Sequence, residues 1–146
     1  MRIKTISLTV HGEAVPKARP KLVVNKYTGK AHMYTADKTR NWEACVLGQA
    51  LEKRPKNLIE GPIWLRIKLY KRIPKSWSKK KHLEALDGFL LPTGRPDLSN
   101  YIKSIEDALN GIYWGDDGQV VGYLDKTGKY YSEEPRVELD VQYWED

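Results

Sequence analysis

Several acids and one lysine lie close together in the C-terminal third of the chain, where a helix and the turn after it could gather their side chains. The residues are Asp97, Lys103, Asp107 and the adjacent pair Asp116 and Asp117. The chain as a whole carries a net charge of +6. Carboxylates repel nucleic acid, so acids in a basic chain indicate a divalent cation placed between them and a phosphate. This pattern predicts a metal-dependent nuclease centre.

Magnesium is the ion that such a centre would use. Hydrolysis of a phosphodiester requires an activated water and stabilisation of charge on the leaving 3′-oxygen, and Mg²⁺ supplies both. Mg²⁺ prefers hard oxygen ligands, and Mn²⁺ is the alternative ion. Asp97 and either Asp116 or Asp117 are the predicted ligands, with Asp107 as a supporting acid. Lys103 is predicted to orient the phosphate or to offset charge on the leaving oxygen.

Each of these residues also has an ordinary structural explanation. Asp97 could serve as a helix N-cap, and Lys103 with Asp107 could form a surface pair four residues apart. Asp116 and Asp117, followed by a glycine, could simply form a turn. Taken one at a time these explanations are favoured, but together they require several independent coincidences around one helix.

Charge is distributed unevenly along the chain. Residues 1–92 carry 20 Lys and Arg against 7 Asp and Glu, whereas residues 93–146 carry 5 against 12. Basic surface attracts polyanions, which favours DNA as the partner, although lysines and arginines could equally well only solvate exposed faces. The predicted DNA-binding residues are Lys17, Arg19, Lys21, Lys79, Lys80, Lys81 and Arg95.

Length and composition indicate an ordinary globular protein. A chain of 146 residues is the size of one domain, so we expect a single domain over residues 1–146. Its apolar runs are too short to span a bilayer, and residues 1–10 lack the apolar block of a signal peptide, which together favour the cytosol. The single cysteine, Cys45, is predicted to be a small buried residue.

The apolar pattern predicts an α/β fold, with a mixed β-sheet flanked by helices. The first half of the chain reads as a strand, a hairpin, a helix and a second strand with clear alternation. The second half reads as a short helix capped by Ser78, a longer helix after Asp97, and two strands around a turn. The expected ranges are strand 1–11, hairpin turn 27–30, helix 37–53, strand 62–73 and turn 125–128.

The helix after Asp97 is the best defined of these elements. Apolar residues recur every three to four positions along it and form one stripe for burial. At about 100° per residue, Asn100, Lys103 and Asp107 fall together on the opposite face, with Ser99 and Glu106 beside them. We expect Ser99, Asn100 and Asp107 to surround the metal ligands and support them.

The same stretch resembles the RusA family of Holliday junction resolvases. The resemblance rests on a central motif and on a similar N-terminal segment: residues 95–100, Lys103, residues 107–111, residues 116–120, and upstream residues 15–20 and 34–35. It implies a RusA-like fold and a homodimer that cuts two symmetry-related strands of a four-way DNA junction in recombination and repair. It also implies that Asp97 and Asp117 bind the metal and that Lys103 is essential.

One position departs from the family's pattern. The family has a second acid two residues after the first, and this chain has Ser99 there. A hydroxyl is a weak neutral ligand, so the chain could be an active resolvase in which a neighbouring acid compensates, or a junction-binding protein with weak or no cleavage. A third possibility is an unrelated basic binding module. The three histidines of the chain do not have the spacing of zinc ligands, which argues against zinc catalysis.

Overall fold

Alternating apolar residues form the central strand of the fold, as the sequence predicts. The computed structural model describes residues 1–17, 21–34 and 37–146. The strands are β1 (Arg2–His11), β2 (Lys21–Val24), β3 (Ala31–Tyr34), β4 (Ile63–Arg72), β5 (Val120–Tyr123), β6 (Gly128–Ser132) and β7 (Arg136–Glu145). The helices are α1 (Asp37–Ala50), α2 (Lys79–Leu86) and α3 (Leu98–Leu109), and the two 3₁₀ turns are η1 (Leu51–Lys53) and η2 (Asp117–Gln119).

Five strands form one mixed sheet, and β2 and β3 form a separate hairpin. The sheet order is β1-β7-β4, with both neighbouring pairs antiparallel. On its other side β4 pairs in parallel with two short strands, with β5 along Ile63–Leu65 and with β6 along Lys68–Arg72. This mixed α/β architecture confirms the predicted fold class.

The number of strands after α3 differs from the prediction. We expected two strands around the turn at residues 125–128, and the structure has three. β5 and β6 lie on either side of that turn and pair with β4 instead of with each other. All residues of β6 are half-buried, so the strand shows none of the alternation on which a prediction would rest.

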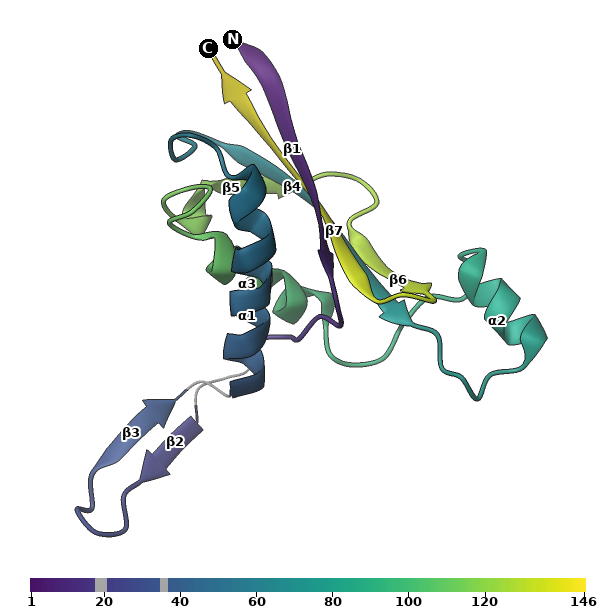
Figure 1. The fold of residues 1–146 in the computed structure, drawn as a ribbon, viewed down its shortest axis with the longest axis horizontal. Coiled ribbons are helices and arrows are strands. Elements are labelled where there is room, and N and C mark those ends of the chain that lie inside the picture. The colour runs from purple at the N-terminus through teal and green to yellow at the C-terminus, as the bar shows by residue number, and fades with distance from the viewer. Residues whose placement is uncertain (18–20, 35–36) are drawn as a thin grey trace.

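The core lies between one face of the sheet and two helices. Figure 1 shows α1 and α3 on the same face of the sheet. Buried residues at alternating positions of β4 and β7 form one apolar cluster with residues of both helices. Burial of these apolar side chains holds the helices in place. The residues with at most 1 % exposure include Val46, Ala50, Ile63, Leu65, Ile67, Leu69, Ile105, Leu109, Val137, Leu139 and Val141.

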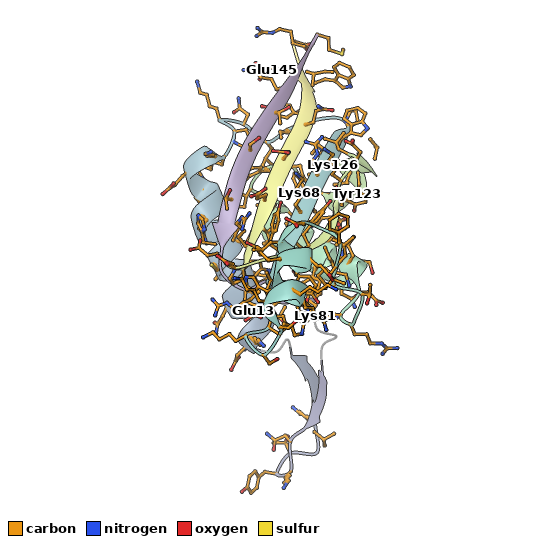
Figure 2. All side chains as sticks on the ribbon, turned by 90° about the vertical axis from the view of Figure 1, so that its right-hand side faces the viewer. Glu13, Lys68, Lys81, Tyr123, Lys126 and Glu145 are labelled. Carbon is orange, nitrogen blue, oxygen red and sulfur yellow. The ribbon has the colours of Figure 1, made fainter. Side chains whose placement is uncertain are left out.

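The two ends of the sheet differ in what they carry. Glu145 marks one end in Figure 2, whereas Glu13 and Lys81 lie toward the other end, and the β2–β3 hairpin extends beyond it.

Within the described residues, no helix combines the length and the apolar character needed to cross a membrane.

The prediction for Cys45 is wrong, because this side chain is exposed. The buried stripe of α1 contains Trp42, Val46 and Ala50. Cys45 precedes Val46 by one position, and one position on a helix turns the side chain by about 100° away from the stripe.

Candidate active site

The start of α3 is anchored by β6. Lys129 extends from β6 and its Nζ donates to the carbonyl oxygens of Gly94 at 2.9 Å and Pro96 at 3.3 Å. Asp97 occupies the N-cap position, yet within the described chain its carboxylate accepts no capping hydrogen bond from the helix. The ordinary explanation for Asp97 therefore does not account for its side chain, which remains exposed at the head of α3.

Lys103 joins α3 to the turn that follows it. Its Nζ lies 2.8 Å from Asp117 Oδ2 and 3.2 Å from Asp107 Oδ1. The hydrogen bond from Lys103 lowers the pKa of Asp117, and the bonds to Asp117 and then Asp107 raise the pKa of Lys103. At neutral pH the lysine is therefore a cation and both neighbours favour that charge. Three of the predicted site residues come together here.

Lys17 extends this arrangement to the first helix. Its Nζ lies 2.8 Å from Glu43 Oε1 on α1 and 3.2 Å from Asp107 Oδ2 on α3. Its backbone N–H donates to the carbonyl of Asn100 at 2.9 Å. The result is an alternating chain of charges, here called the charge ladder: Glu43, Lys17, Asp107, Lys103 and Asp117.

The ladder gives Lys17 a place that the sequence did not indicate. We expected Lys17 on a DNA-binding surface, but its ammonium lies between two carboxylates, and the hydrogen bond to Glu43 raises its pKa. The Lys17 side chain is 27% exposed, against 51% for Lys103, so less of it faces solvent. Glu43 was not predicted at all, because nothing in its local sequence connects it with residues 60 positions further along the chain.

A braced turn presents Asp117 to the ladder. Asp116 Oδ2 accepts from the Gly118 N–H at 3.0 Å, so this carboxylate caps η2. Gln119 Oε1 accepts from the N–H groups of Gly115 and Asp116, and Gln119 Nε2 donates to the carbonyls of Ile59 and Gly61. The turn thus fixes Asp117 at the first position of η2, and it gives Asp116 a local structural role.

Glu106 is the buried acid beside the ladder. We placed it next to Lys103 on the polar side of α3, but its exposure is only 7 %. The hydroxyl of Tyr123 on β5 donates to Glu106 Oε2 at 2.9 Å. Burial raises the pKa of Glu106, and burial together with Glu106 raises the pKa of Tyr123 to about 12. Tyr123 is a further residue that the sequence did not indicate.

The remaining predicted residues lie outside the ladder. Ser99, Asn100 and Arg95 are exposed near the start of α3. Lys79, Lys80 and Lys81 are exposed in the first turn of α2, where Lys81 Nζ lies 4.1 Å from the centre of the Trp77 ring. Arg19 is outside the described residues, and Lys21 begins β2 without a described side chain.

Comparison with known proteins identifies the family. The family model for endodeoxyribonuclease RusA matches residues 11–142. The chain belongs to the RusA family. A Bacillus subtilis (strain 168) protein named YqaN, described as uncharacterized, is 42% identical over 139 residues, covering 94% of this chain and 95% of YqaN. A Lactococcus phage r1t protein named crossover junction endodeoxyribonuclease rusA is 26% identical over 134 residues, covering 88% and 91% of the two chains.

RusA nucleases are metal-dependent, which requires side chains that can hold a metal ion. The carboxylate oxygens of Asp97, Asp107 and Asp117 are the hard donors that Mg²⁺ prefers. Among the described residues no three His, Cys, Asp or Glu side chains lie close enough together to hold a metal ion. Mg²⁺ that keeps its waters and binds a phosphate needs only one or two protein carboxylates. The cation that Asp107 and Asp117 share is the ammonium of Lys103.

Proposed function

We propose that this RusA-family chain is a magnesium-dependent endonuclease that resolves Holliday junctions by paired phosphodiester hydrolysis, with Mn²⁺ as the alternative ion. The observation that supports this most is the charge ladder. It joins Lys103 and Asp117, which both lie within the stretch that the family model matches, although they belong to different elements. Local structure does not require this contact, because Asp117 needs no lysine partner to form its turn.

The residues would have distinct tasks at the scissile phosphate. An ammonium placed beside the phosphate can donate a hydrogen bond to a non-bridging oxygen and offset the charge that develops on the leaving 3′-oxygen. Lys103 can do this because its side chain is 51% exposed despite its two carboxylate partners. Asp97 and Asp117 would hold Mg²⁺, which would supply an activated water at the phosphate. Asp116 is the proposed third ligand, provided that it can leave its capping bond.

DNA would be held by the cations outside the ladder. Exposed lysines and arginines contribute affinity through phosphate contacts without reading sequence. Arg95 lies two residues before Asp97 and is exposed, so it can contact a phosphate next to the one that is cut. Lys79, Lys80 and Lys81 form a second basic site on α2, and we propose that they contact one arm of the junction.

Two cuts on opposite strands require two centres, so the proposed working unit is a symmetric homodimer. Each chain contains one ladder, and a two-fold axis would place a second ladder at the symmetry-related strand. The dimer would act on four-way junction DNA in recombination and repair.

A junction-binding protein with weak or no cleavage is the second candidate. The observation that favours it is Ser99, which replaces an acid of the family motif, combined with the lack of a three-carboxylate group among the described residues. In this case the same surfaces would bind the junction and the ladder would be only structural.

Cleavage of a synthetic four-way junction separates these possibilities. The purified protein is incubated with a labelled junction and with a linear duplex of the same sequence, with Mg²⁺, with Mn²⁺, or with a chelator. Metal-dependent paired nicks in the junction support the resolvase, whereas junction binding without nicks supports the second candidate. Lys103→Gln should abolish cleavage, and Lys56→Gln, at an exposed lysine outside the ladder, should retain it. Lack of preference for the junction over the duplex would contradict both candidates.

A further inference from the structure

The β2–β3 hairpin ends in a turn of fixed geometry. Asn25 Oδ1 accepts from the N–H groups of Tyr27 at 2.8 Å and Thr28 at 3.2 Å. The Asn25 N–H donates to the carbonyl of Lys30 at 2.8 Å, and the Gly29 N–H donates to the carbonyl of Asn25 at 2.9 Å. Gly29 has a φ of +70°, a conformation that glycine adopts without strain. The turn therefore presents its tip in one defined shape.

An aromatic side chain stands at that tip. Residues 24–30 are all exposed, and Tyr27 is 98% exposed, the highest value among the large apolar and aromatic side chains described. Both views show the hairpin extending beyond the rest of the domain (Figures 1 and 2). Within the described residues, β2 and β3 pair only with each other. A two-stranded hairpin is marginal in water, so this hairpin is suited to contact with another molecule.

The charge of the hairpin indicates an anionic partner. Residues 18–34 contain four Lys and Arg and no Asp or Glu. Lys26 and Lys30 flank the tip, and both are exposed. Cations beside an exposed aromatic ring are the combination with which proteins bind nucleic acid, since the cations contact phosphates and the ring stacks on a base.

The hairpin is attached next to the charge ladder. The chain leaves the ladder at Lys17, and α1 begins at Asp37, six residues before the ladder residue Glu43. β2 spans four residues, and at about 3.3 Å per residue it rises roughly 10 Å before the turn begins. This reach is comparable with the depth of the DNA major groove, about 8.5 Å, so a hairpin beside the scissile phosphate can extend from the backbone to the bases.

We propose that the hairpin is a DNA-binding arm that places Tyr27 against an exposed base at the centre of the four-way junction. The inference rests on the proposed function, because it assumes that junction DNA is bound at the ladder. Bases inside a continuous duplex are stacked on both faces, whereas bases at a branch point offer a free face. An aromatic tip therefore binds branched DNA more tightly than linear DNA.

Fluorescence of 2-aminopurine, placed at each base next to the branch point in turn, tests the proposal. Stacking quenches this base, so wild-type protein should change its emission at one or more of these positions, and Tyr27→Ala should not. The ratio of duplex to junction Kd should fall in Tyr27→Ala by about five- to 150-fold, as for loss of one base–aromatic contact. Tyr27→Trp should restore both readouts. Phe89→Ala removes another strongly exposed aromatic, 82% exposed, and should leave both unchanged.

The outcomes of these experiments distinguish a failure of the DNA-binding arm from a failure of the proposed function. Junction cleavage and junction preference equal to wild type in Tyr27→Ala would overturn the arm and leave the nuclease intact. An equal loss of junction and duplex binding would overturn the contact at the branch point. Conversion of a dimer into a monomer by Tyr27→Ala, seen by light scattering, would show that the hairpin binds a second copy of the chain instead. Wild-type protein without any junction binding would remove the proposed function itself.

Discussion

The two carboxylate partners of Lys103 differ in their contacts with other lysines. Asp107 also contacts Lys17, whereas the described contacts of Asp117 to lysine are those to Lys103 alone. The hydrogen bond from Lys103 lowers the pKa of Asp117, so this carboxylate stays ionised throughout the neutral range. Asp117 is thus an end member of the ladder, like Glu43, and removal of its charge affects only the contact with Lys103.

Asp117→Asn should separate cleavage from binding. Loss of the proposed ligand and of a fixed charge should reduce junction cleavage by roughly 100- to 1,000-fold. Junction affinity should stay unchanged or improve, because one negative charge near the phosphates is removed. Single-turnover cleavage and gel-shift titration measure the two effects. Asp87→Asn, an exposed aspartate at the end of α2, is the matched control. Cleavage at the wild-type rate would exclude Asp117 from the centre.

Ser99 tests how this chain tolerates the loss of the family's second acid. We expect a neighbouring acid to compensate, so in Ser99→Asp the added charge should crowd an occupied site, and cleavage should stay level or fall. Titration of Mg²⁺ measures the concentration for half-maximal cleavage. Ser99→Ala then shows whether the hydroxyl contributes at all. A large gain of activity in Ser99→Asp would mean that nothing compensates.

Glu106 should make stability depend on pH. Burial raises its pKa above the ordinary value of 4.5, so the folded state loses stability as pH rises from that value to the raised pKa. Glutamine does not ionise. The free energy of unfolding of Glu106→Gln minus that of wild type should therefore increase as pH rises above 4.5 and level off above the raised pKa of Glu106.

Urea unfolding at a series of pH values measures this difference. Tyr123→Phe supplies a second readout, since it removes the hydrogen bond that lowers the pKa of Glu106, and stability should then continue to fall to higher pH than in wild type. A difference that is the same at pH 4 and pH 7 would show that Glu106 is not desolvated.

Among the elements, α3 was the most predictable. Its buried residues Tyr101, Ile102, Ile105 and Leu109 follow the spacing seen in the sequence, and the strand over Ile63–Arg72 shows the expected alternation. Such periodic patterns report burial on one face, which is a local property. Which residues of other elements pack against that face is not a local property. Glu43 and Tyr123 reach the site from α1 and β5, and no pattern in either element indicates that contact.

The basic start of α2 should contribute to DNA affinity. Changing Lys79, Lys80 and Lys81 together to Gln should flatten the dependence of log Kd on log salt concentration by about one unit per lost phosphate contact. Ser78, whose Oγ accepts from the Lys81 N–H, is retained so that α2 still forms. Binding titrations at several salt concentrations measure the slope. An unchanged slope would mean that these lysines only solvate the end of the helix.

At the scale of the whole molecule, the number of centres sets the number of subunits. Each chain offers one charge ladder, so paired cuts require a dimer, whose interface should bury roughly 1,200–2,000 Å². Light scattering should give about twice 16.9 kDa at the concentrations at which junctions are cleaved. A mass of 16.9 kDa under those conditions would contradict the paired mechanism.

The position of β1 also affects how the sheet can be assembled during synthesis. In the described sheet β1 lies at the edge and pairs with β7, with Arg2 opposite Glu145 and His11 opposite Arg136. At about 5–20 residues per second the ribosome needs roughly 5–30 s to make the chain between these partners. β7 must then insert between β1 and β4, so β1 stays unpaired until β7 has been synthesised. A nascent chain that stalls before residue 136 exposes two unpaired strand edges, which favours aggregation.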